Sequence, residues 1–419
     1  MPTDLELLSP ARVADPYPVY EVLRAQGSVV EVPEQGLWLA TTYAACLEIL
    51  GDTERFSSRE SLSGRNQFKA HPEAASVLRG GPGYPRVPTL ILTDPPQHTR
   101  YRRLVQRAFA PAKTIKQLRP ELERIVDELI DGFVDHGSCD FVAEFAYPLP
   151  MQVISLVLGI PPEMRDTLKR WSDDFIAAQA GNIDAERVAS AAASTVEFEH
   201  YVSDEFDRRA AAPDRYERTD FLSRLVVEDE ASSPEERLSR QEQLSLVQQM
   251  LVGGNETTTN LLGNAMAILA NNPEQAERLR ADLTRVPEFV EEALRYRSPL
   301  QGLFRMTTRD TQVQGIDLPA GAKVMVLFGS ANRDEGVYSR PGFDPDRDNR
   351  SNPHLAFGRG AHACMGQGLA RAEAATAVAR LVGRLADIRQ VPGSVWAPVE
   401  LFGFHGHRVL DIEFIARKA

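Results

Sequence analysis

Cysteine is scarce in this 419-residue chain, which contains only Cys46, Cys139 and Cys364. A sparse, odd set of cysteines argues against a disulfide framework and favours a reducing compartment. Long apolar runs are missing as well. The most lipid-like stretch, Met151–Ile160, is interrupted by polar residues and has about half the length needed to span a bilayer. The sequence therefore predicts a cytoplasmic protein without a membrane anchor.

Basic residues are fewer than acidic ones. The sequence has 47 basic and 59 acidic side chains, so the net charge is −12. This balance argues against a general nucleic-acid binder and against attraction to an anionic membrane. The first residues, Met1–Glu6, are acidic where a secretory signal would be basic. The content of 43% hydrophobic and 25% charged residues is ordinary for a globular protein and excludes a disordered, collagen-like or coiled-coil chain.

Helical patterns dominate the sequence. Apolar periodicity and capping residues predict helices over 118–133, 239–271, 287–296 and 366–386. The longest of these opens with a capping box, Ser239 and Glu242. Asn272 and Pro273 indicate the cap and first turn of another helix.

Strand-like segments are short, and three hairpins are expected. They pair 29–32 with 37–40, 313–318 with 323–328 around Pro319–Gly321, and 401–404 with 409–414. The breaker-rich segment Gly80–Pro88 indicates a mobile loop inside a domain. No repeat or linker interrupts the chain, so we expect a mainly α fold with a smaller β region.

The most informative segment surrounds Cys364. It reads Phe357-Gly358-Arg359-Gly360-Ala361-His362-Ala363-Cys364-Met365-Gly366. Its glycines permit tight turns and the close approach of a flat ligand. A cysteine at the start of a helix favours the thiolate, which is an iron ligand or a nucleophile.

Three other interpretations of this segment compete. A single cysteine is most often buried and inert. Residues 358–363 also mimic the dinucleotide fingerprint G-x-G-x-x-A, but a poor strand precedes them and no βαβ unit follows so near the C-terminus. A zinc site would need further cysteine and histidine partners at suitable spacing, and these are missing from the sequence.

The complete segment resembles the haem-binding signature of the cytochrome P-450 superfamily, F-x-x-G-x-[HR]-x-C-x-G. The fixed positions match at Phe357, Gly360, His362, Cys364 and Gly366. The resemblance implies that the protein binds haem b (iron protoporphyrin IX) and that Cys364 is the proximal thiolate ligand of its iron. It also implies that Phe357 packs beside the sulfur and that His362 reaches a haem propionate. The implied fold places the haem between the long central helix and the helix after the cysteine loop.

The middle of the long predicted helix contains Gly253-Gly254-Asn255-Glu256-Thr257-Thr258-Thr259. Two glycines in a helix cost about 2 kcal/mol relative to alanine, and consecutive threonines lower helix propensity further. One interpretation is a helix crossing at which small residues permit close packing. The segment also resembles the family pattern [AG]-G-x-[DE]-T, which implies that Glu256 and Thr257 form the catalytic acid–alcohol pair that delivers protons. Glycine at 253 stands where alanine is commoner, which would slightly widen the oxygen pocket.

Glu292 and Arg295 form an E-x-x-R pair, which alone is weak because most such pairs are exposed. Its place between the threonine helix and the cysteine loop matches the family. The resemblance implies a buried ion pair that locks the meander before Cys364. The segments 332–334 and 343–347 look like that meander.

Residues 94–103 resemble the family segment D-P-P-x-H-x-x-x-R. His98 and Arg102 are one helical turn apart, so both side chains can face one anion. The family assigns them to haem propionates, and Arg305 matches a third propionate ligand. A capping histidine and ordinary surface arginines are the competing interpretations.

Seven basic residues and no acidic ones lie between Gln97 and Pro120. They are Arg100, Arg102, Arg103, Arg107, Lys113, Lys116 and Arg119. In an acidic protein this local reversal indicates a docking face for an acidic partner. A solvated helix face is the competing interpretation, and a nucleic-acid site is a distant third.

The matching segments run from about residue 94 to 366 in family order, so we expect a single cytochrome P-450 haem domain over 1–419. The implied activity is a monooxygenase that inserts one atom of O2 into a C–H bond of a hydrophobic small molecule. Only 55 residues follow Cys364, so we expect no fused reductase and external electron donors. A ferredoxin, with a [2Fe–2S] cluster, and an NAD(P)H-dependent ferredoxin reductase are the expected partners. A peroxide-driven peroxygenase and a non-catalytic haem or small-molecule sensor are the alternatives.

The substrate is not defined by these motifs. The segments expected to line the pocket are 88–91, 249–253, 299–304 and 401–404, which are mostly apolar. A terpene, aromatic compound, fatty acid or steroid would suit such a lining, although the same side chains are equally compatible with plain core. The loop from Glu60 to Pro88 is the expected lid over the pocket.

Overall fold

The computed structural model describes residues 13–59, 72–79, 87–178, 184–348, 350–399 and 403–417. The chain forms two compact units. Unit 1 comprises Met1–Ser57, Leu118–Pro150 and Glu256–Ala419, and unit 2 comprises Ser58–Gln117 and Met151–Asn255. Most of the expected lid lies outside the described residues. The assignment of both units to one functional haem domain stays a prediction.

A five-stranded sheet organises unit 1 within the described residues, in the order β1-β2-β8-β5-β3. Its strands are β1 (Val29–Val32), β2 (Leu37–Ala40), β3 (Phe56–Ser57), β5 (Gly302–Thr307) and β8 (Lys323–Leu327). The predicted β1–β2 hairpin is confirmed, with Val29 opposite Ala40. β8 pairs in parallel with β2 and antiparallel with β5.

The central strand β8 is apolar almost throughout because both of its faces are buried. Val324 and Val326 pack on one side, in the cluster that contains Cys46 and Ile49 of α3 (Tyr43–Gly51). The alternate residues of β8 pack on the other side, against α2 (Tyr17–Gln26). Because side chains alternate between the two faces of a strand, β8 contributes to both core clusters, one on each face of the sheet.

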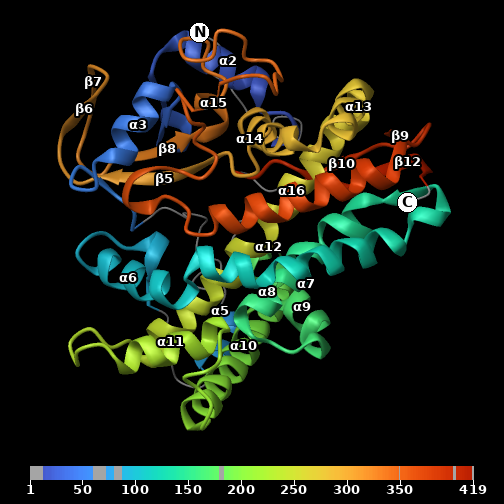
Figure 1. The fold of residues 1–419 in the computed structure, drawn as a ribbon. Coiled ribbons are helices and arrows are strands. Elements are labelled where there is room, and N and C mark those ends of the chain that lie inside the picture. The colour runs from blue at the N-terminus through green and yellow to red at the C-terminus, as the bar shows by residue number, and fades with distance from the viewer. Residues whose placement is uncertain are drawn as a thin grey trace. The chain divides into compact units, whose positions relative to one another are not determined.

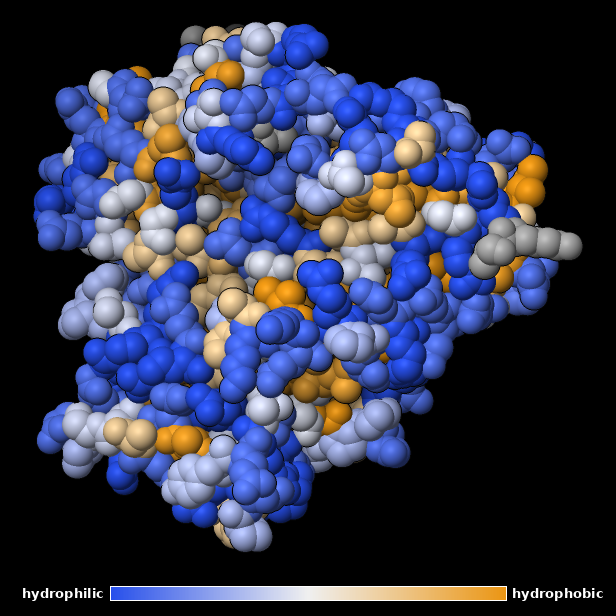
Figure 2. Space-filling view, in the orientation of Figure 1, coloured by the Kyte–Doolittle hydropathy of each residue, from blue (hydrophilic) through white to orange (hydrophobic). Residues whose placement is uncertain are grey.

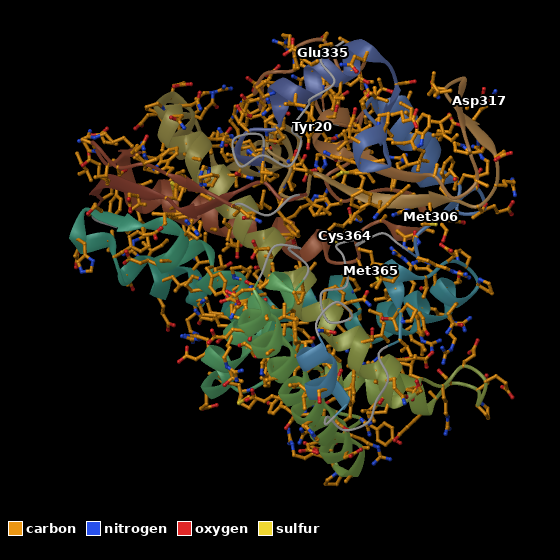
Figure 3. The ribbon with its side chains drawn as sticks, turned by 180° about the vertical axis from the view of Figure 1, so that it is seen from behind. Tyr20, Met306, Asp317, Glu335, Cys364 and Met365 are labelled. Atoms are coloured by element: carbon orange, nitrogen blue, oxygen red, sulfur yellow. The ribbon has the colours of Figure 1, made fainter. Side chains whose placement is uncertain are left out.

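The predicted pairing of 313–318 with 323–328 is wrong. The first segment is itself a hairpin of β6 (Thr311–Val313) and β7 (Ile316–Leu318), whereas β8 belongs to the five-stranded sheet. Gln314 and Gly315 have φ of 49° and 79°, so the tight turn lies between these two strands. The hairpin extends from the sheet in Figure 1, and Asp317 marks it in Figure 3.

The predicted pairing of 401–404 with 409–414 is also wrong for the described residues. β12 (Asp411–Ala416) lies between β4 (Ser138–Asp140) and β9 (Leu385–Gln390), so both of its edges are already occupied. Phe404 instead bridges to Leu300. A short pair, β10 (Ala397–Pro398) and β11 (His407–Val409), completes this region of unit 1.

The long helix α12 (Arg240–Asn271) begins with the predicted capping box. The Glu242 backbone N–H donates to the Ser239 hydroxyl at 3.3 Å, and the Ser239 N–H donates to the Glu242 carboxylate at 2.7 Å. α13 (Pro273–Ala281) follows as predicted. The Asn272 side chain does not cap α13, because its amide donates backwards to the Ile268 carbonyl of α12.

The remaining helices of unit 1 are α14 (Val286–Tyr296), the short α15 (Phe328–Ala331) and α16 (Gln367–Arg384). Unit 2 is built from α5 (Pro72–Arg79), α6 (Gln97–Phe109), α9 (Arg165–Ala177), α10 (Ala185–Ala211) and α11 (Phe221–Glu230). In unit 2, α10 packs against α5, α9 and α11, and α11 packs against α6. Three helices continue from one unit into the other, namely α7 (Pro111–Asp131), α8 (Pro148–Leu158) and α12.

The described residues confirm a mainly α fold with a smaller β region. None of their helices has the length and apolar character that crossing a bilayer requires. Polar and charged side chains cover most of the face shown in Figure 2, where hydrophobic residues gather only in small patches.

Candidate functional site

The cysteine loop has a tightly defined backbone. Gly358 and Gly360 have φ of 64° and 70°, in the left-handed region that favours glycine. A Cβ at Gly360 would lie 2.5 Å from the carbonyl oxygen of Leu50 in α3, so the loop packs closely on that helix. The Cys364 N–H donates to the Phe357 carbonyl at 2.9 Å and closes the loop.

Cys364 is exposed, whereas Cys46 and Cys139 are buried. Burial raises the thiol pKa of both Cys46 and Cys139, so neither provides a thiolate near neutral pH. Cys364, which Figure 3 labels together with Met365, precedes α16. This helix begins at Gln367 rather than at the cysteine. A Cβ at Gly366 would lie 3.9 Å from the Cys364 sulfur, which is an ordinary van der Waals contact. The chemistry and accessibility of this sulfur fit a haem-iron ligand.

The predicted Glu292–Arg295 ion pair is confirmed, and both side chains are fully buried. Two hydrogen bonds of 2.8 and 2.7 Å join the guanidinium to the carboxylate. Arg295 also donates to the carbonyls of Asn332 and Gly342, and Glu292 accepts from the Asp344 N–H. The pair therefore holds the meander as the sequence predicts.

Asn332 connects the ion pair to the segment that leads into the cysteine loop through hydrogen bonds. Its side-chain oxygen accepts from the Leu355 N–H at 2.6 Å, and its amide donates to the Ser298 hydroxyl at 2.8 Å. Leu355 lies two residues before Phe357, where the loop begins. Sequence reasoning placed Asn332 in the meander but did not predict this role.

A second polar network supports Phe357 and was not predicted. The Arg371 guanidinium lies 4.5 Å from the centroid of the Phe357 ring and binds the Glu291 carboxylate. Glu291 also contacts the His354 ring at 3.2 Å. Burial raises the pKa of Glu291, but the hydrogen bonds from His354 and Arg371 outweigh this effect and lower it to about 2. The only sequence signal was the spacing of Arg371, which lies one turn into α16.

The two glycines of the α12 motif differ in their surroundings. A Cβ at Gly254 would lie 2.9 Å from the Ile154 side chain, so this position is a close helix crossing within unit 2. Gly253 is exposed, and nothing lies within 4 Å of a Cβ built on it. Close packing therefore explains Gly254 but not Gly253, and the acid–alcohol interpretation of the motif stays a prediction. The helix continues unbroken through Glu256 and Thr257, which are both half-buried.

The predicted propionate ligands are distributed between the units. In unit 1, Arg305 lies on β5, is 3% exposed and donates to the Phe304 carbonyl. His362 lies in the short turn before Cys364. In unit 2, His98 is buried in the first turn of α6, and Arg102 lies one turn later on the same helix, half-buried. Thus Cys364, Phe357, His362, Arg305, Glu256 and Thr257 belong to unit 1, and His98 and Arg102 belong to unit 2.

The basic segment is less available to a partner than the sequence suggests. Arg100, Arg103 and Arg107 form ion pairs with Glu242, Glu236 and Glu228 of their own unit. These acidic residues follow more than 100 positions later, so the local charge count did not reveal them. The exposed cations that remain are Lys113, Lys116 and Arg119, all on α7.

Several residues of the segments expected to line the substrate pocket are instead packed against other parts of their own unit. Leu300, Leu303 and Phe304 pack against the core clusters of unit 1. In unit 2 the Gln249 amide donates to the Thr89 carbonyl and hydroxyl, which holds the segment 88–91 against α12. Leu401 and Phe402 lie outside the described residues.

Comparison with known proteins supplies the family. The family model of Cytochrome P450 matches residues 59–386. The chain is 36% identical to the cytochrome P450 monooxygenase PikC of Streptomyces venezuelae, over 94% of this chain and 90% of that protein. It is 34% identical to a steroid C26-monooxygenase of Mycolicibacterium smegmatis, over 88% of this chain and 85% of that protein.

A solved structure agrees. That of cytochrome P450 CYP109Q5 from Chondromyces apiculatus superimposes with a TM-score of 0.83 and is 35% identical, covering 99% of this chain and 98% of that one. The chain belongs to the cytochrome P450 family. It is a haem-thiolate monooxygenase that uses O2, redox partners and a hydrophobic substrate. The resemblance identified in the sequence is therefore confirmed.

Proposed function

We propose that the protein binds haem b, with Cys364 as the thiolate ligand of the iron. The observation that carries this assignment is the exposure of Cys364, at the end of a loop whose backbone is fixed by Gly360 and by the network of Arg295 and Asn332. Cys46 and Cys139 are buried and have raised thiol pKa values, so they do not compete. When bound, the haem supplies reductive activation of O2.

The experiment that tests this assignment is the absorbance of the reduced carbonyl adduct. The wild-type protein should show the strongly red-shifted band of a thiolate-ligated haem. Cys364→Ser should abolish that band, whereas Cys139→Ala, which removes a buried thiol of the same unit, should retain it. A band that survives in Cys364→Ser would refute the assignment.

The other residues of the site have roles that follow from the family pattern. Phe357 packs beside the sulfur, while His98, Arg102, Arg305 and His362 neutralise the two haem propionates. The supporting observation in unit 2 is the spacing of His98 and Arg102 on one face of α6. Replacing Arg305 or Arg102 by Leu should weaken haem retention during gel filtration, and Arg124→Leu on an exposed part of α7 should not.

Glu256 and Thr257 are proposed as the acid–alcohol pair. The Thr257 hydroxyl holds a water molecule, and the Glu256 carboxylate passes protons toward it. Positioned proton delivery contributes about a hundred-fold to ten-thousand-fold in rate. Thr257→Ala should divert electrons from product to hydrogen peroxide, whereas Thr257→Ser should remain coupled. Equal coupling in both variants would contradict the assignment.

The proposed electron donor is an acidic ferredoxin with a [2Fe–2S] cluster, reduced by an NAD(P)H-dependent ferredoxin reductase in the cytoplasm. Lys113, Lys116 and Arg119 on α7 support this choice, because all three cations are exposed. Reversing these three charges to Glu should lower the rate of haem reduction by ferredoxin. Reduction by dithionite, a small reagent, should be unchanged.

The proposed substrate is a hydrophobic molecule of small to medium size. A steroid is the first candidate to test, because one relative carries the name steroid C26-monooxygenase. Titration of steroids, terpenes, fatty acids and aromatic compounds should reveal a haem spin-state shift with at least one class. The absence of a shift with every class would contradict a substrate of this kind.

A further inference from the structure

One face of α12 carries a row of polar side chains inside unit 1. Glu256, Asn260 and Asn264 are four residues apart and so lie above one another on the helix. The Asn260 amide donates to the Glu256 carboxylate at 3.3 Å. The Asn264 amide donates to the carbonyls of His405 and Arg297 at 2.9 and 3.1 Å. Both asparagines are buried, with exposed fractions of 1% and 0%.

The segment His405–His407 lies across this face. A Cβ at Gly406 would overlap the Asn260 side chain, at 2.1 Å from its oxygen, so the backbone here lies directly against Asn260. The His407 ring approaches the next turn of the helix, where a Cβ at Gly263 would lie 4.0 Å from the ring carbon Cδ2. Glycine at both positions allows the segment and the helix to approach one another.

Five buried polar atoms in this cluster have no hydrogen-bond partner among the residues that the structure describes. They are Asn260 Oδ1, Asn264 Oδ1, His405 Nδ1, His407 Nδ1 and His407 Nε2. Buried polar atoms in proteins are almost always hydrogen-bonded, either to protein or to ordered water. A cluster of this kind is what a short internal water chain requires, because each water needs two to four polar partners.

The two histidines suit such a chain because they are neutral. Burial, followed by the positive charge of Arg297, lowers the pKa of His407 to about 4. Burial also lowers the pKa of His405, to which Arg297, His407 and Arg333 contribute. A neutral imidazole has one N–H donor and one acceptor nitrogen, so it can receive a proton on one side and release one from the other.

We propose that Asn260, Asn264, His405 and His407 hold ordered water that relays protons from His407 to the Glu256 carboxylate. This inference rests on the proposed role of Glu256 as the proton-delivering acid. A proton enters on the acceptor nitrogen of His407, and the proton on its other nitrogen leaves to the neighbouring water, so the ring is again neutral. The water bound at Asn260 Oδ1 then returns to Glu256 the proton that this acid has given up. No electrons move in these steps.

Asn260 is a positioning residue in this relay. Its amide orients the Glu256 carboxylate, and its oxygen holds the water, while the Gly406 backbone prevents the side chain from swinging away. The segment His405–His407, far from the acid–alcohol motif in sequence, would thus supply the acid with protons. Neither motif indicates this connection.

The first test compares variants of the holoenzyme. His407→Phe keeps the ring volume but removes both nitrogens, whereas His407→Gln keeps one donor and one acceptor. We expect His407→Phe and Asn260→Leu to lower the fraction of electrons recovered in product by about tenfold and to change the solvent deuterium isotope effect on turnover. His407→Gln should restore both quantities toward wild type. Equal coupling and isotope effects in wild type, His407→Phe and Asn260→Leu would overturn the relay.

The second test does not depend on turnover. A high-resolution crystal structure should show ordered water within hydrogen-bonding distance of Asn260 Oδ1 and of a ring nitrogen of His407. The structure of His407→Phe should lose the water nearest the ring and keep the backbone of Gly406 in place. Absence of water beside Asn260 in the wild-type structure would also overturn the proposal, whatever the variants do.

Failure of this relay can be distinguished from failure of the proposed function. If Glu256→Gln leaves coupling unchanged, then Glu256 is not the proton-delivering acid and the proposed function is wrong in that respect. If Glu256→Gln uncouples the enzyme but His407→Phe and Asn260→Leu do not, then Glu256 keeps its role and only the relay fails.

Discussion

Two polar networks in unit 1 satisfy their hydrogen-bonding groups in opposite ways. Around Arg295, the side-chain atoms of Arg295, Glu292 and Asn332 all have protein partners. On the face of α12, by contrast, Asn260 and Asn264 each donate to protein while their oxygens have no partner among the described residues.

The difference matches the role that we propose for each network. A fully satisfied network of buried charges fixes one geometry, and losing any member leaves another unpaired. That suits the support of the Cys364 loop, because a metal ligand must be held in place. A network with unsatisfied neutral groups is completed by water, and water can exchange protons. That suits the delivery of protons to Glu256.

The largest effect is expected from breaking the first network. Arg295→Met removes a cation that is fully buried and leaves the Glu292 carboxylate without its main partner. The expected loss is about 3–5 kcal/mol of unfolding free energy, together with poor haem retention. Urea unfolding measures the first quantity. Arg124→Met, at an exposed pair with Glu121 and Glu128, is the control and should leave the free energy of unfolding nearly unchanged. Equal losses would mean that the burial of Arg295 has no energetic consequence.

The buried acid Glu373 on α16 offers a further contrast with the two networks, because its effect on stability should depend on pH. Glu373 is 2% exposed, and burial raises its pKa to about 8. The unfolded chain releases this proton near the ordinary value of 4.5, whereas the folded protein keeps it up to about pH 8. Stability should therefore fall as pH rises through this window, by about 1.4 kcal/mol per pH unit from this group. Glu373→Gln should flatten the dependence in urea unfolding at pH 5, 6.5 and 8. An unchanged slope would show that Glu373 does not hold a proton.

The signal for Glu373 was present in the sequence but was not used. Leu369, Glu373, Ala377 and Leu381 are four residues apart, and the structure buries all of them. A charged residue within such an apolar stripe indicates a buried acid.

Alanine substitutions at the two left-handed glycines of the cysteine loop should differ in their stability cost, because only Gly360 lies against a neighbouring backbone. Gly360→Ala adds a Cβ at 2.5 Å from the Leu50 oxygen and strains a left-handed residue. Gly358→Ala imposes a similar backbone strain, but its nearest neighbour lies at 3.8 Å. Gly358→Ala should cost about 1 kcal/mol, and Gly360→Ala about 2–3 kcal/mol with a weakened reduced-carbonyl band. Thermal unfolding and absorbance measure both, and identical behaviour would disprove the close contact with α3.

The smallest effect is expected at the glycine pair of α12. Gly253→Ala meets open space and removes a poor helix former, so it should raise stability by up to about 1 kcal/mol. Gly254→Ala gains the same propensity but meets the Ile154 side chain at 2.9 Å, so the gain should be cancelled or reversed. Thermal unfolding of the two variants gives the comparison. A larger gain at Gly254 would contradict the tight crossing.

Much of the fold followed from local patterns. The capping box of Ser239 and Glu242, the β1–β2 hairpin and the helix after Asn272 were all predicted, because each depends on residues within a few positions of one another. The second hairpin was wrong because the Gln314–Gly315 turn was read as strand. The pairing of 409–414 was wrong because distant strands, β4 and β9, occupy both edges of β12.

Local motifs were sufficient to predict the buried Glu292–Arg295 pair, which the structure confirms. They also nominate Cys364, Phe357, Glu256 and Thr257, whose roles stay proposals. The long-range contacts around these residues were revealed only by the tertiary structure. Arg371 binds Glu291 from 80 positions away, and His405 reaches Asn264 from 141. No periodicity in the sequence links such residues, because their separation in space is set by how whole helices and strands bury their apolar faces.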